Sequence, residues 1–397
     1  WITAAGVAGA ILLVSLLRYL EPICCLTPTR PPDLISTVTG VSALAILAGL
    51  FVRFGSGKKM LVSLSILALV AIFIVLKTEP LSLAASIGLR SLSGQSANMA
   101  TGFDIRWLGI SYIAFRLLHT LRDHQTGKAN NLNLQEFMIY VLFFPALSAG
   151  PIDRAPRFAQ DLRKPFQLDA KEVLAGGERL VMGIFKKFVL ADTLAVIALS
   201  EVSASQAAST GWTWLMLYAY ALRIYFDFSG YTDIAIGLGR LFGIALPENF
   251  DKPYLKPNLT LFWNSWHMTL AQWFRAYFFN PVTRALRTLS KPIPMFLIIL
   301  VGQLSTMLLI GLWHGFTWNF VLWGLWHGLG MFIHNRWSDY LRKRLAGKVI
   351  TPRWQFWLNL GGMLLTFHYV TLGWVWFVLP DLASSLRVFG LLLGVST

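Results

Sequence analysis

The chain has 397 residues, of which 55% are hydrophobic and only 13% are charged. This composition excludes an ordinary soluble domain and is typical of a polytopic membrane protein, so the lipid bilayer is the first partner we expect. The net charge of +15 does not indicate nucleic-acid binding, because the basic residues stand between apolar runs, where membrane proteins carry cytoplasmic loops. The two cysteines, Cys24 and Cys25, are adjacent and offer neither a disulfide framework nor a set of metal ligands.

Apolar segments recur along the whole chain, near residues 2–17, 35–52, 60–76, 107–118, 136–149, 181–199, 212–226, 234–246, 293–313, 316–334, 355–379 and 382–395. A crossing helix needs about 20 residues, so we expect the shorter segments to be re-entrant or to lie flat. The sequence shows no internal repeat and no linker rich in proline and serine. We therefore predict one all-α integral-membrane domain over residues 1–397, with N-terminal transmembrane helices in residues 1–106. The chain starts at Trp1, and we expect the natural N-terminus to lie upstream.

Basic residues predict part of the topology, because cytoplasmic loops are enriched in lysine and arginine. We place residues 53–59 and 337–353 in the cytoplasm, since both contain basic clusters. Basic residues also flank the apolar segment 136–149 on both sides, and a simple crossing there would leave one basic cluster outside. We therefore expect either that residues 136–149 do not span or that a neighbouring element is re-entrant. Residues 80–104 are poor in charge and form either a non-cytoplasmic or a partly buried connection.

The first stretch with candidate chemistry is residues 144–158, FPALSAGPIDRAPRF. Its Gly-Pro pair ends a helix and starts a turn. Asp153, Arg154 and Arg157 follow at once. This charged group either binds a phosphate-bearing donor or anionic headgroups, or belongs to a plain cytoplasmic loop.

The second stretch is residues 223–233, RIYFDFSGYTD. Arg223 and Asp227 are four residues apart on an apolar helix, where each charge alone would be costly. We therefore predict an ion pair between them within the helix. The Ser-Gly pair at 229–230 permits a break in the helix. Asp233 follows that break and is a candidate substrate-binding residue that would line a polar cavity.

The third stretch is residues 258–279, NLTLFWNSWHMTLAQWFRAYFF. Asn264, His267 and Arg275 fall on one face if the stretch is one continuous helix. Such a face suits the rim of a cavity and makes His267 a candidate catalytic residue, with Asn264 and Arg275 as candidate substrate-binding residues. The alternative is an amphipathic interfacial helix with a solvated histidine.

The fourth stretch, residues 292–335, contains no Asp, Glu, Lys or Arg and is long enough for two crossings. His314 stands at its middle between two glycines, so a helical hairpin would place it at the turn or draw it into the protein. An ionisable residue at membrane depth is a functional candidate, and we take His314 as the candidate catalytic residue. The alternative is a structural histidine packed against Trp313 and Trp318.

Other catalytic signatures are missing from the sequence. It contains no phosphate-binding glycine loop, no nucleotide fingerprint, no Cys/His metal spacing and no G-x-S-x-G motif. We therefore predict no metal site and no tightly bound cofactor. The chemistry that remains is that of histidines within the membrane.

Taken together, these motifs resemble the membrane-bound O-acyltransferase family, and within it the bacterial branch of alginate O-acetylation and teichoic-acid D-alanylation proteins. The matching stretches are GISYIAFR (109–116), FFPALSAGPIDR (143–154), IFKKFVLADTLA (184–195), YFDFSGYTDIAIG (225–237), NFDKPYLKPNLTLFWNSWHMTL (249–270) and GLWHGFTWNFVLWGLWHG (311–328). They keep the family's order across residues 107–379. Two positions depart from the pattern, because Ser265 stands where relatives usually carry arginine and Ala276 where they usually carry aspartate.

The resemblance implies about eleven membrane-embedded helices around a central tunnel. It implies that His314 is the catalytic histidine of the W-H-G motif and His267 the second family histidine, and we add Trp313 and Asn319 of the same motif as candidate substrate-binding residues. It implies an acyl donor such as acetyl-CoA or a carrier-protein thioester, and a glycan or polyol acceptor outside the cytoplasmic membrane. A periplasmic or extracellular partner protein is expected for this branch.

Histidine chemistry fits such a transfer, because a neutral imidazole can take the hydroxyl proton as the oxygen attacks a thioester. We therefore expect a multi-pass enzyme of the cytoplasmic membrane that acetylates an extracytoplasmic polysaccharide. D-alanyl transfer to a teichoic-acid-type polymer is the alternative within this class. A transporter with a histidine and aspartate relay, or an assembly subunit without chemistry, is the alternative outside it.

Overall fold

A computed structural model describes residues 2–19, 33–55, 59–92, 94–106, 108–128, 132–165, 169–346 and 351–395. The predictions that concern Cys24, Cys25 and Lys58 lie outside these residues. Within them the regular structure is helical, apart from one antiparallel bridge between Phe250 and Trp266. The all-α class predicted from the composition is therefore confirmed.

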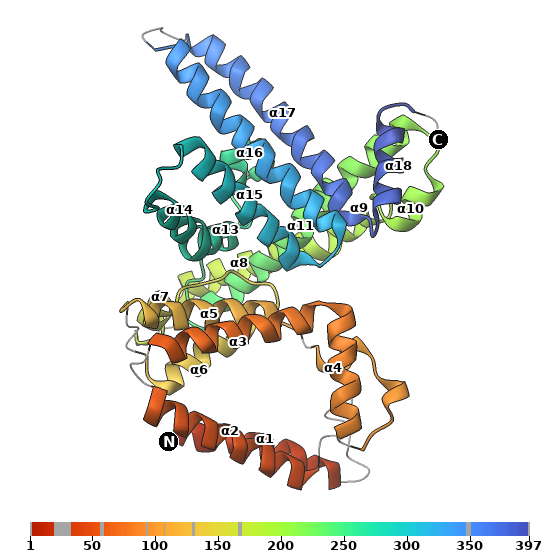
Figure 1. Cartoon of the computed structure of the whole chain (residues 1–397). Coiled ribbons are helices and arrows are strands. Elements are labelled where there is room, and N and C mark those ends of the chain that lie inside the picture. Colours follow the sequence, from red (N-terminus) through yellow and green to blue (C-terminus); the bar gives the residue numbers. More distant parts are fainter. Residues whose placement is uncertain are drawn as a thin grey trace.

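The N-terminal part contains five helices: α1 (Ile2–Leu16), α2 (Leu34–Gly55), α3 (Lys59–Lys77), α4 (Glu79–Leu92) and α5 (Ile110–Gln125). Figure 1 shows α1 beside α2 at one end of the molecule and α3 beside α5 nearer its middle. The connection after α4 folds back on that helix, because the Asp104 carboxylate accepts hydrogen bonds of 2.6 Å from both Ser86 Oγ and Arg90 Nε. Residues 80–104 are thus a helix followed by a tethered turn.

The middle part contains short helices and one long one: α6 (Leu134–Leu142), α7 (Ala155–Leu162), α8 (Ala170–Ile184), a π-helical turn (Phe185–Ala191), α9 (Asp192–Ala195), α10 (Glu201–Gln206) and α11 (Thr210–Leu241). Helix α6 has only nine residues, which at 1.5 Å per residue cannot cross a bilayer. The length of α6 favours the first alternative, that residues 136–149 do not span. The break predicted at residues 229–230 is wrong, because α11 runs through them without interruption.

Glycines on α8 and α11 explain why the Ser-Gly pair does not break the helix. A Cβ atom on Gly230 would lie 2.8 Å from the carbonyl oxygen of Gly183, and one on Gly237 would lie 2.7 Å from that of Gly176. The two helices pack so closely that only hydrogen fits at these positions, as in other membrane helix pairs. Gly230 is therefore a packing residue, and α11 needs no bend there.

The C-terminal part contains α12 (Leu259–Trp263), α13 (Met268–Phe274), a π-helical turn (Arg275–Phe279), α14 (Asn280–Arg287), α15 (Met295–His314), α16 (Trp318–Arg344), α17 (Pro352–Val378) and α18 (Leu382–Leu392). Helices α15 and α16 form the hairpin predicted for residues 292–335, with His314 as the last residue of α15. Figure 1 shows α16 and α17 side by side at the end of the molecule opposite α1 and α2. A core of aromatic side chains fills the space between α12, α16 and α17.

Among the described residues, three helices are long and apolar enough to cross a membrane: α3, α15 and α17. Helix α3 is an apolar helix before the first motif, and α15 is the uncharged helix of the hairpin that ends at His314. The larger number of about eleven embedded helices and the central tunnel stay predictions.

Candidate active site

The turn of the α15–α16 hairpin holds His314. Gly311, one turn earlier, lets the carbonyl of Phe320 in α16 approach to a distance that a side chain would prevent. The two helices are therefore in close contact just below the histidine. This packing fixes His314 at the end of α15 although the residue itself sits beside a loop.

Aromatic rings surround His314. Its ring centroid lies 4.5 Å from that of Trp313, 4.7 Å from Phe377 and 5.5 Å from Trp323. Trp318, which the structural alternative expected as a neighbour, is instead 72% exposed. No hydrogen bond to the His314 ring is found within the described ranges, so its nitrogens are not used to hold the fold together.

His267 does not lie on a continuous helix, which corrects the one-face prediction for residues 258–279. Helix α12 ends at Trp263 and α13 begins at Met268, and His267 between them has left-handed backbone angles, φ 43° and ψ 54°. The cause is a strand-like contact with residues 249–251. Met268 N donates to Asn249 O at 2.9 Å, and Asp251 N donates to Ser265 O at 3.0 Å. These hydrogen bonds replace the helical ones.

The Asn249 side chain orients His267. Its Oδ1 accepts from Thr269 N at 3.2 Å, from Thr269 Oγ1 at 2.6 Å and from His267 Nδ1 at 3.3 Å. A backbone N–H only donates, so the asparagine atom at this position must be the oxygen. His267 Nδ1 must then carry the hydrogen. In the neutral ring Nε2 is left with a lone pair, and this atom is buried without a hydrogen-bond partner among the described residues.

Trp313 is the shared neighbour of the two histidines. Its ring centroid lies 6.3 Å from His267 as well as 4.5 Å from His314. Two other parts of the chain reach the same indole, because Phe115 of α5 packs against it at 5.6 Å and Lys77 Nζ at the end of α3 lies 5.6 Å from its centroid. Trp313 Nε1 is a buried donor with no partner in the described part of the chain. The structure thus brings together His267, Trp313 and His314.

Asn264 and Arg275 also meet, but through the break rather than along one helix. Arg275 Nη2 donates to Asn264 Oδ1 at 2.6 Å. The pair borders a cavity of about 150 Å³ beside α15, which is lined by Thr260, Trp263, Asn264, Ala271, Arg275, Phe279, Gln303, Thr306, Met307, Ile310 and Met331. Ile310 lies one turn before His314 on the same helix. The cavity therefore reaches the helix that carries the candidate base, and Asn264 and Arg275 face it.

Asp233 and Asn319 are placed elsewhere. Asp233 is buried on α11 and pairs with Arg179 and with Lys186, whose Nζ lies 2.6 Å from Oδ2. Asn319 is 2% exposed and donates to Leu379 O at 2.8 Å, which ties α16 to the end of α17. In the described residues neither side chain forms a hydrogen bond or ion pair with His267 or His314, and both have structural partners instead.

The predicted ion pair of Arg223 with Asp227 is also wrong. Asp227 pairs with Lys187 of the π-helical turn and is 51% exposed. The four-residue spacing would allow the intrahelical pair. Packing of α8 and its π-helical extension against α11 instead brings Lys187 to the carboxylate.

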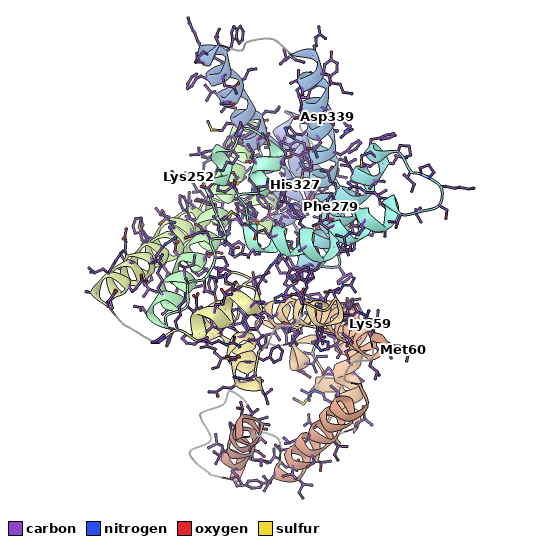
Figure 2. All side chains as sticks on the ribbon, turned by 90° about the vertical axis from the view of Figure 1, so that its left-hand side faces the viewer. Lys59, Met60, Lys252, Phe279, His327 and Asp339 are labelled. Atoms are coloured by element: carbon purple, nitrogen blue, oxygen red, sulfur yellow. The ribbon has the colours of Figure 1, made fainter. Side chains whose placement is uncertain are left out.

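Two residues near these groups do not stand out in the sequence motifs. His327 is fully buried in α16, with both ring nitrogens lacking a partner among the described residues, and Figure 2 shows it in the middle of the C-terminal helices. The repeat of the W-H-G tripeptide at residues 326–328 was the available signal. Asn249 is the second of these residues. Nothing in its sequence context marks it as the partner of a histidine 18 residues away.

The helical hairpin is uncharged and carries a histidine at its turn. A second histidine with a free ring nitrogen lies next to it. Together these features define a membrane protein with a histidine-centred site. The family model of the membrane-bound O-acyltransferases matches residues 46–375. The chain belongs to this family of acyltransferases.

Three relatives illustrate the range of the family around this chain. A teichoic acid D-alanyltransferase of Streptococcus thermophilus is 31% identical, over 69% of this chain and 68% of the relative. The probable alginate O-acetylase AlgI of Azotobacter vinelandii is 35% identical, over 71% of this chain and 52% of the relative. A peptidoglycan O-acetyltransferase of Helicobacter pylori is 33% identical, over 66% of this chain and 47% of the relative. The chain thus spans about half the length of the two O-acetylating relatives.

Proposed function

We propose that this chain is a multi-pass O-acyltransferase of the cytoplasmic membrane. It transfers an acetyl group from a cytoplasmic thioester donor, such as acetyl-CoA or an acylated carrier protein, to a hydroxyl of an extracytoplasmic polysaccharide. The observation that carries the proposal is the grouping of His267, Trp313 and His314, in which ring nitrogens are left free of structural hydrogen bonds. About eleven embedded helices, a tunnel and an extracytoplasmic partner protein belong to the same proposal.

His314 acts as the general base in this reaction. Its imidazole takes the proton of the acceptor hydroxyl while the oxygen attacks the thioester carbonyl. The C–O bond forms, the C–S bond breaks, and the thiolate leaves and accepts the proton from the imidazolium. The aromatic cage keeps water from the thioester, which would otherwise be hydrolysed.

His267 and Trp313 support the base in different ways. With Nδ1 donating to Asn249, neutral His267 has only an acceptor at Nε2 and cannot donate to the developing oxyanion. Its place is to accept a hydrogen bond from the acceptor hydroxyl or from His314. The indole N–H of Trp313 is the free donor in this group, and we assign it to the carbonyl oxygen of the donor.

D-alanyl transfer to a teichoic-acid-type polymer is the second candidate. One observation favours it, because the alignment to the Streptococcus thermophilus D-alanyltransferase covers 68% of that protein, compared with 52% of the alginate relative. The same residues serve both reactions, so analysis of the acyl group on cell-surface polymers decides between them.

The test is the substitution His314→Ala in purified protein. We expect acyl transfer to fall by about 10²–10⁴-fold, the usual cost of losing a general base, with an unchanged elution and melting profile. His124→Ala is the matched control, because His124 is an exposed histidine on α5. Wild-type transfer in His314→Ala would remove the catalytic assignment. Solute flux in liposomes that survives this substitution would support the transporter instead.

A further inference from the structure

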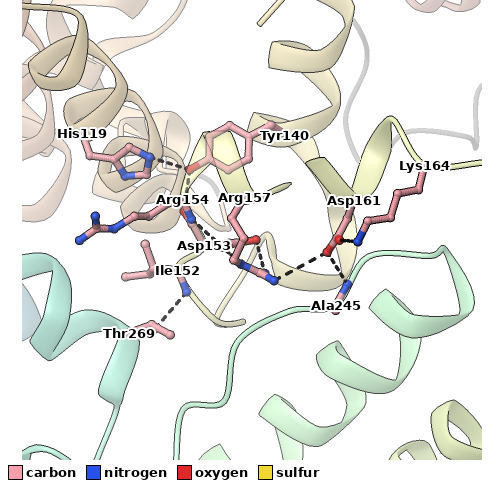
Figure 3. A network of polar contacts seen from close by, with 10 residues as sticks. All are labelled: His119, Tyr140, Ile152, Asp153, Arg154, Arg157, Asp161, Lys164, Ala245 and Thr269. Carbon is pink, nitrogen blue, oxygen red and sulfur yellow. Dashed lines mark hydrogen bonds and ion pairs between the residues drawn. The ribbon is translucent and has the colours of Figure 1, made fainter. Parts of the chain in front are cut away.

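A second cavity, of about 150 Å³, lies between α5, α7, α13 and the turn at residues 150–154. Its lining includes His119, Arg154, Gln272, Trp273 and Tyr277. A single water molecule needs only about 10–15 Å³ on the same measure, so the space is far larger than one water. Figure 3 shows a network of polar contacts that includes His119, Asp153 and Arg154 of this lining.

His119 lines the cavity and has a ring nitrogen that is left as an acceptor without a partner. Tyr140 Oη lies 2.8 Å from His119 Nε2 and donates to the carbonyl oxygen of Asp153 at 2.8 Å. A phenol has one hydrogen, so both contacts are hydrogen bonds only if His119 Nε2 is the donor to Tyr140. In the neutral ring Nδ1 then carries the lone pair. His119 is 1% exposed, and Nδ1 has no partner in the described residues.

Trp273 lines the same cavity and also has a polar atom without a partner. Its Nε1 is buried and has no partner in the part of the chain that the structure describes. Tyr277 closes the wall between these groups, because its ring stacks on His119 with centroids 5.8 Å apart while its hydroxyl donates to Asp123. Two unpartnered buried polar groups at one cavity are costly unless a ligand or solvent satisfies them.

The cavity also has an available positive charge. Asp153 accepts from Arg157 Nε at 2.6 Å, and Arg157 extends to Asp161, so Arg157 is not available to a ligand. Burial raises the pKa of the Asp153 carboxyl, although the hydrogen bonds from Arg157 oppose this shift. The ion pair with Arg157 offsets the negative charge of this carboxylate. Arg154 extends away from this pair toward His119 in Figure 3 and is exposed. Its guanidinium makes no ion pair with any described residue.

We propose that this cavity binds a phosphate monoester. The guanidinium of Arg154 and the indole N–H of Trp273 donate to phosphate oxygens, and the remaining P–OH group of the monoanion donates to His119 Nδ1. A fully ionised anion lacks that hydrogen and leaves the histidine unsatisfied. The group that contains the phosphate is either a soluble molecule or a lipid headgroup.

This site is separate from the histidine pair and does not depend on the proposed reaction. Thr269 connects the two places, because its hydroxyl accepts from Ile152 N at 3.0 Å and donates to Asn249 Oδ1 at 2.6 Å. An occupied phosphate site would hold the turn at residues 150–154, and that turn is hydrogen-bonded to the group that orients His267.

Equilibrium dialysis of the purified full chain in a non-ionic detergent, with radiolabelled inorganic phosphate at pH 6, tests the proposal. Phosphate retains a P–OH group at this pH. We expect saturable binding at one site per chain that excess sulfate at constant ionic strength displaces at least tenfold less well. Arg154→Gln and Trp273→Phe should each weaken binding at least tenfold. Arg284→Gln and Trp337→Phe, at exposed positions away from the cavity, should not change it.

Competition then identifies the source of the phosphate. Coenzyme A, which carries a phosphate monoester, should displace the label if the ligand is soluble. Nanodiscs containing phosphatidic acid, but not phosphatidylcholine alone, should displace it if the ligand is a headgroup. The proposal is overturned by the lack of saturable binding, by equal binding in Arg154→Gln, Trp273→Phe and wild type, or by equal displacement with sulfate. Melting curves of each variant separate lost binding from lost folding, and the assay requires no acyl transfer.

Discussion

His267 occupies a backbone conformation that a residue with a side chain rarely adopts, with φ 43° and ψ 54°. Such a conformation costs on the order of 1–3 kcal/mol and persists only where the surroundings impose it. Here the backbone hydrogen bonds with residues 249–251 impose it, and the Asn249 side chain sets the imidazole tautomer. The tautomer leaves Nε2 as an acceptor that is buried without a hydrogen-bond partner in the described residues.

Asn249→Leu should therefore lower acyl transfer by at least about tenfold, because His267 loses the acceptor that fixes its Nδ1 hydrogen. Asn249→Asp keeps an acceptor at this position and should retain much of the activity. The added negative charge favours the imidazolium, so the acid limb of the pH–rate profile should move to higher pH. The measurement is the pH dependence of transfer for both variants, with melting curves as the folding control.

His267→Gln completes this comparison, because glutamine keeps a hydrogen-bonding group at the same place. We expect it to retain measurable transfer, in contrast to His314→Ala. Complete loss with normal folding would make His267 an equal catalytic partner. An unshifted profile in Asn249→Asp would remove the assignment of Asn249 as a positioning residue.

At the scale of the elements, the contact between α8 and α11 depends on glycine pairs. A Cβ atom on Gly183 would lie 2.6 Å from the carbonyl oxygen of Gly230 and 2.7 Å from the backbone nitrogen of Ile234. Backbone atoms cannot move aside as a flexible side chain can. Gly183→Val should therefore destabilise the protein by about 1–3 kcal/mol or more, the range for overpacking.

Gly177→Val is the matched control, because it lies on the same helix and a Cβ atom there would meet nothing within 4 Å. Both substitutions change the helix propensity of α8 in the same way. Thermal unfolding in detergent should therefore show a large loss for Gly183→Val and a small change for Gly177→Val. Equal losses would mean that propensity, rather than close packing, accounts for these glycines.

The ion pair of Lys187 with Asp227 makes a different prediction. The carboxylate is 51% exposed and the lysine 29% exposed, so the pair should contribute only about 0–1 kcal/mol. A double-mutant cycle of Lys187→Ala and Asp227→Ala on thermal unfolding measures this coupling. Arg223→Ala combined with Asp227→Ala should show no coupling, and a large coupling there would restore the intrahelical pair that the structure replaces.

At the scale of the whole molecule, orientation in the membrane is the main prediction. In a variant with Cys24 and Cys25 changed to serine, single cysteines at positions 58 and 344 should resist an impermeant thiol reagent in intact cells. A cysteine at position 316, in the exposed turn of the α15–α16 hairpin, should react if that turn faces the outside. Labelling at positions 58 and 344 but not at 316 would invert the topology.

The sequence by itself determined the membrane class, the all-α architecture and the hairpin around His314. Each of these depends on local composition, since a long uncharged run must be helical in a bilayer to satisfy its backbone hydrogen bonds. Basic residues on both sides of the short apolar segment at 136–149 conflict with a simple crossing, and the nine-residue length of α6 agrees with this local signal. The W-H-G and W-H motifs made His314 and His267 the candidate catalytic residues through their resemblance to a family, and this assignment stays a prediction.

Only the tertiary structure decided how these residues meet. The break at His267 depends on hydrogen bonds to a segment about 18 residues upstream. Helix α11 runs unbroken through Gly230, where a distant helix packs against it. Asp227 pairs with a lysine 40 residues away rather than with the arginine on its own helix. The composition of a segment reports what it must bury, but the partner of a charge or an imidazole depends on which surfaces packing brings together.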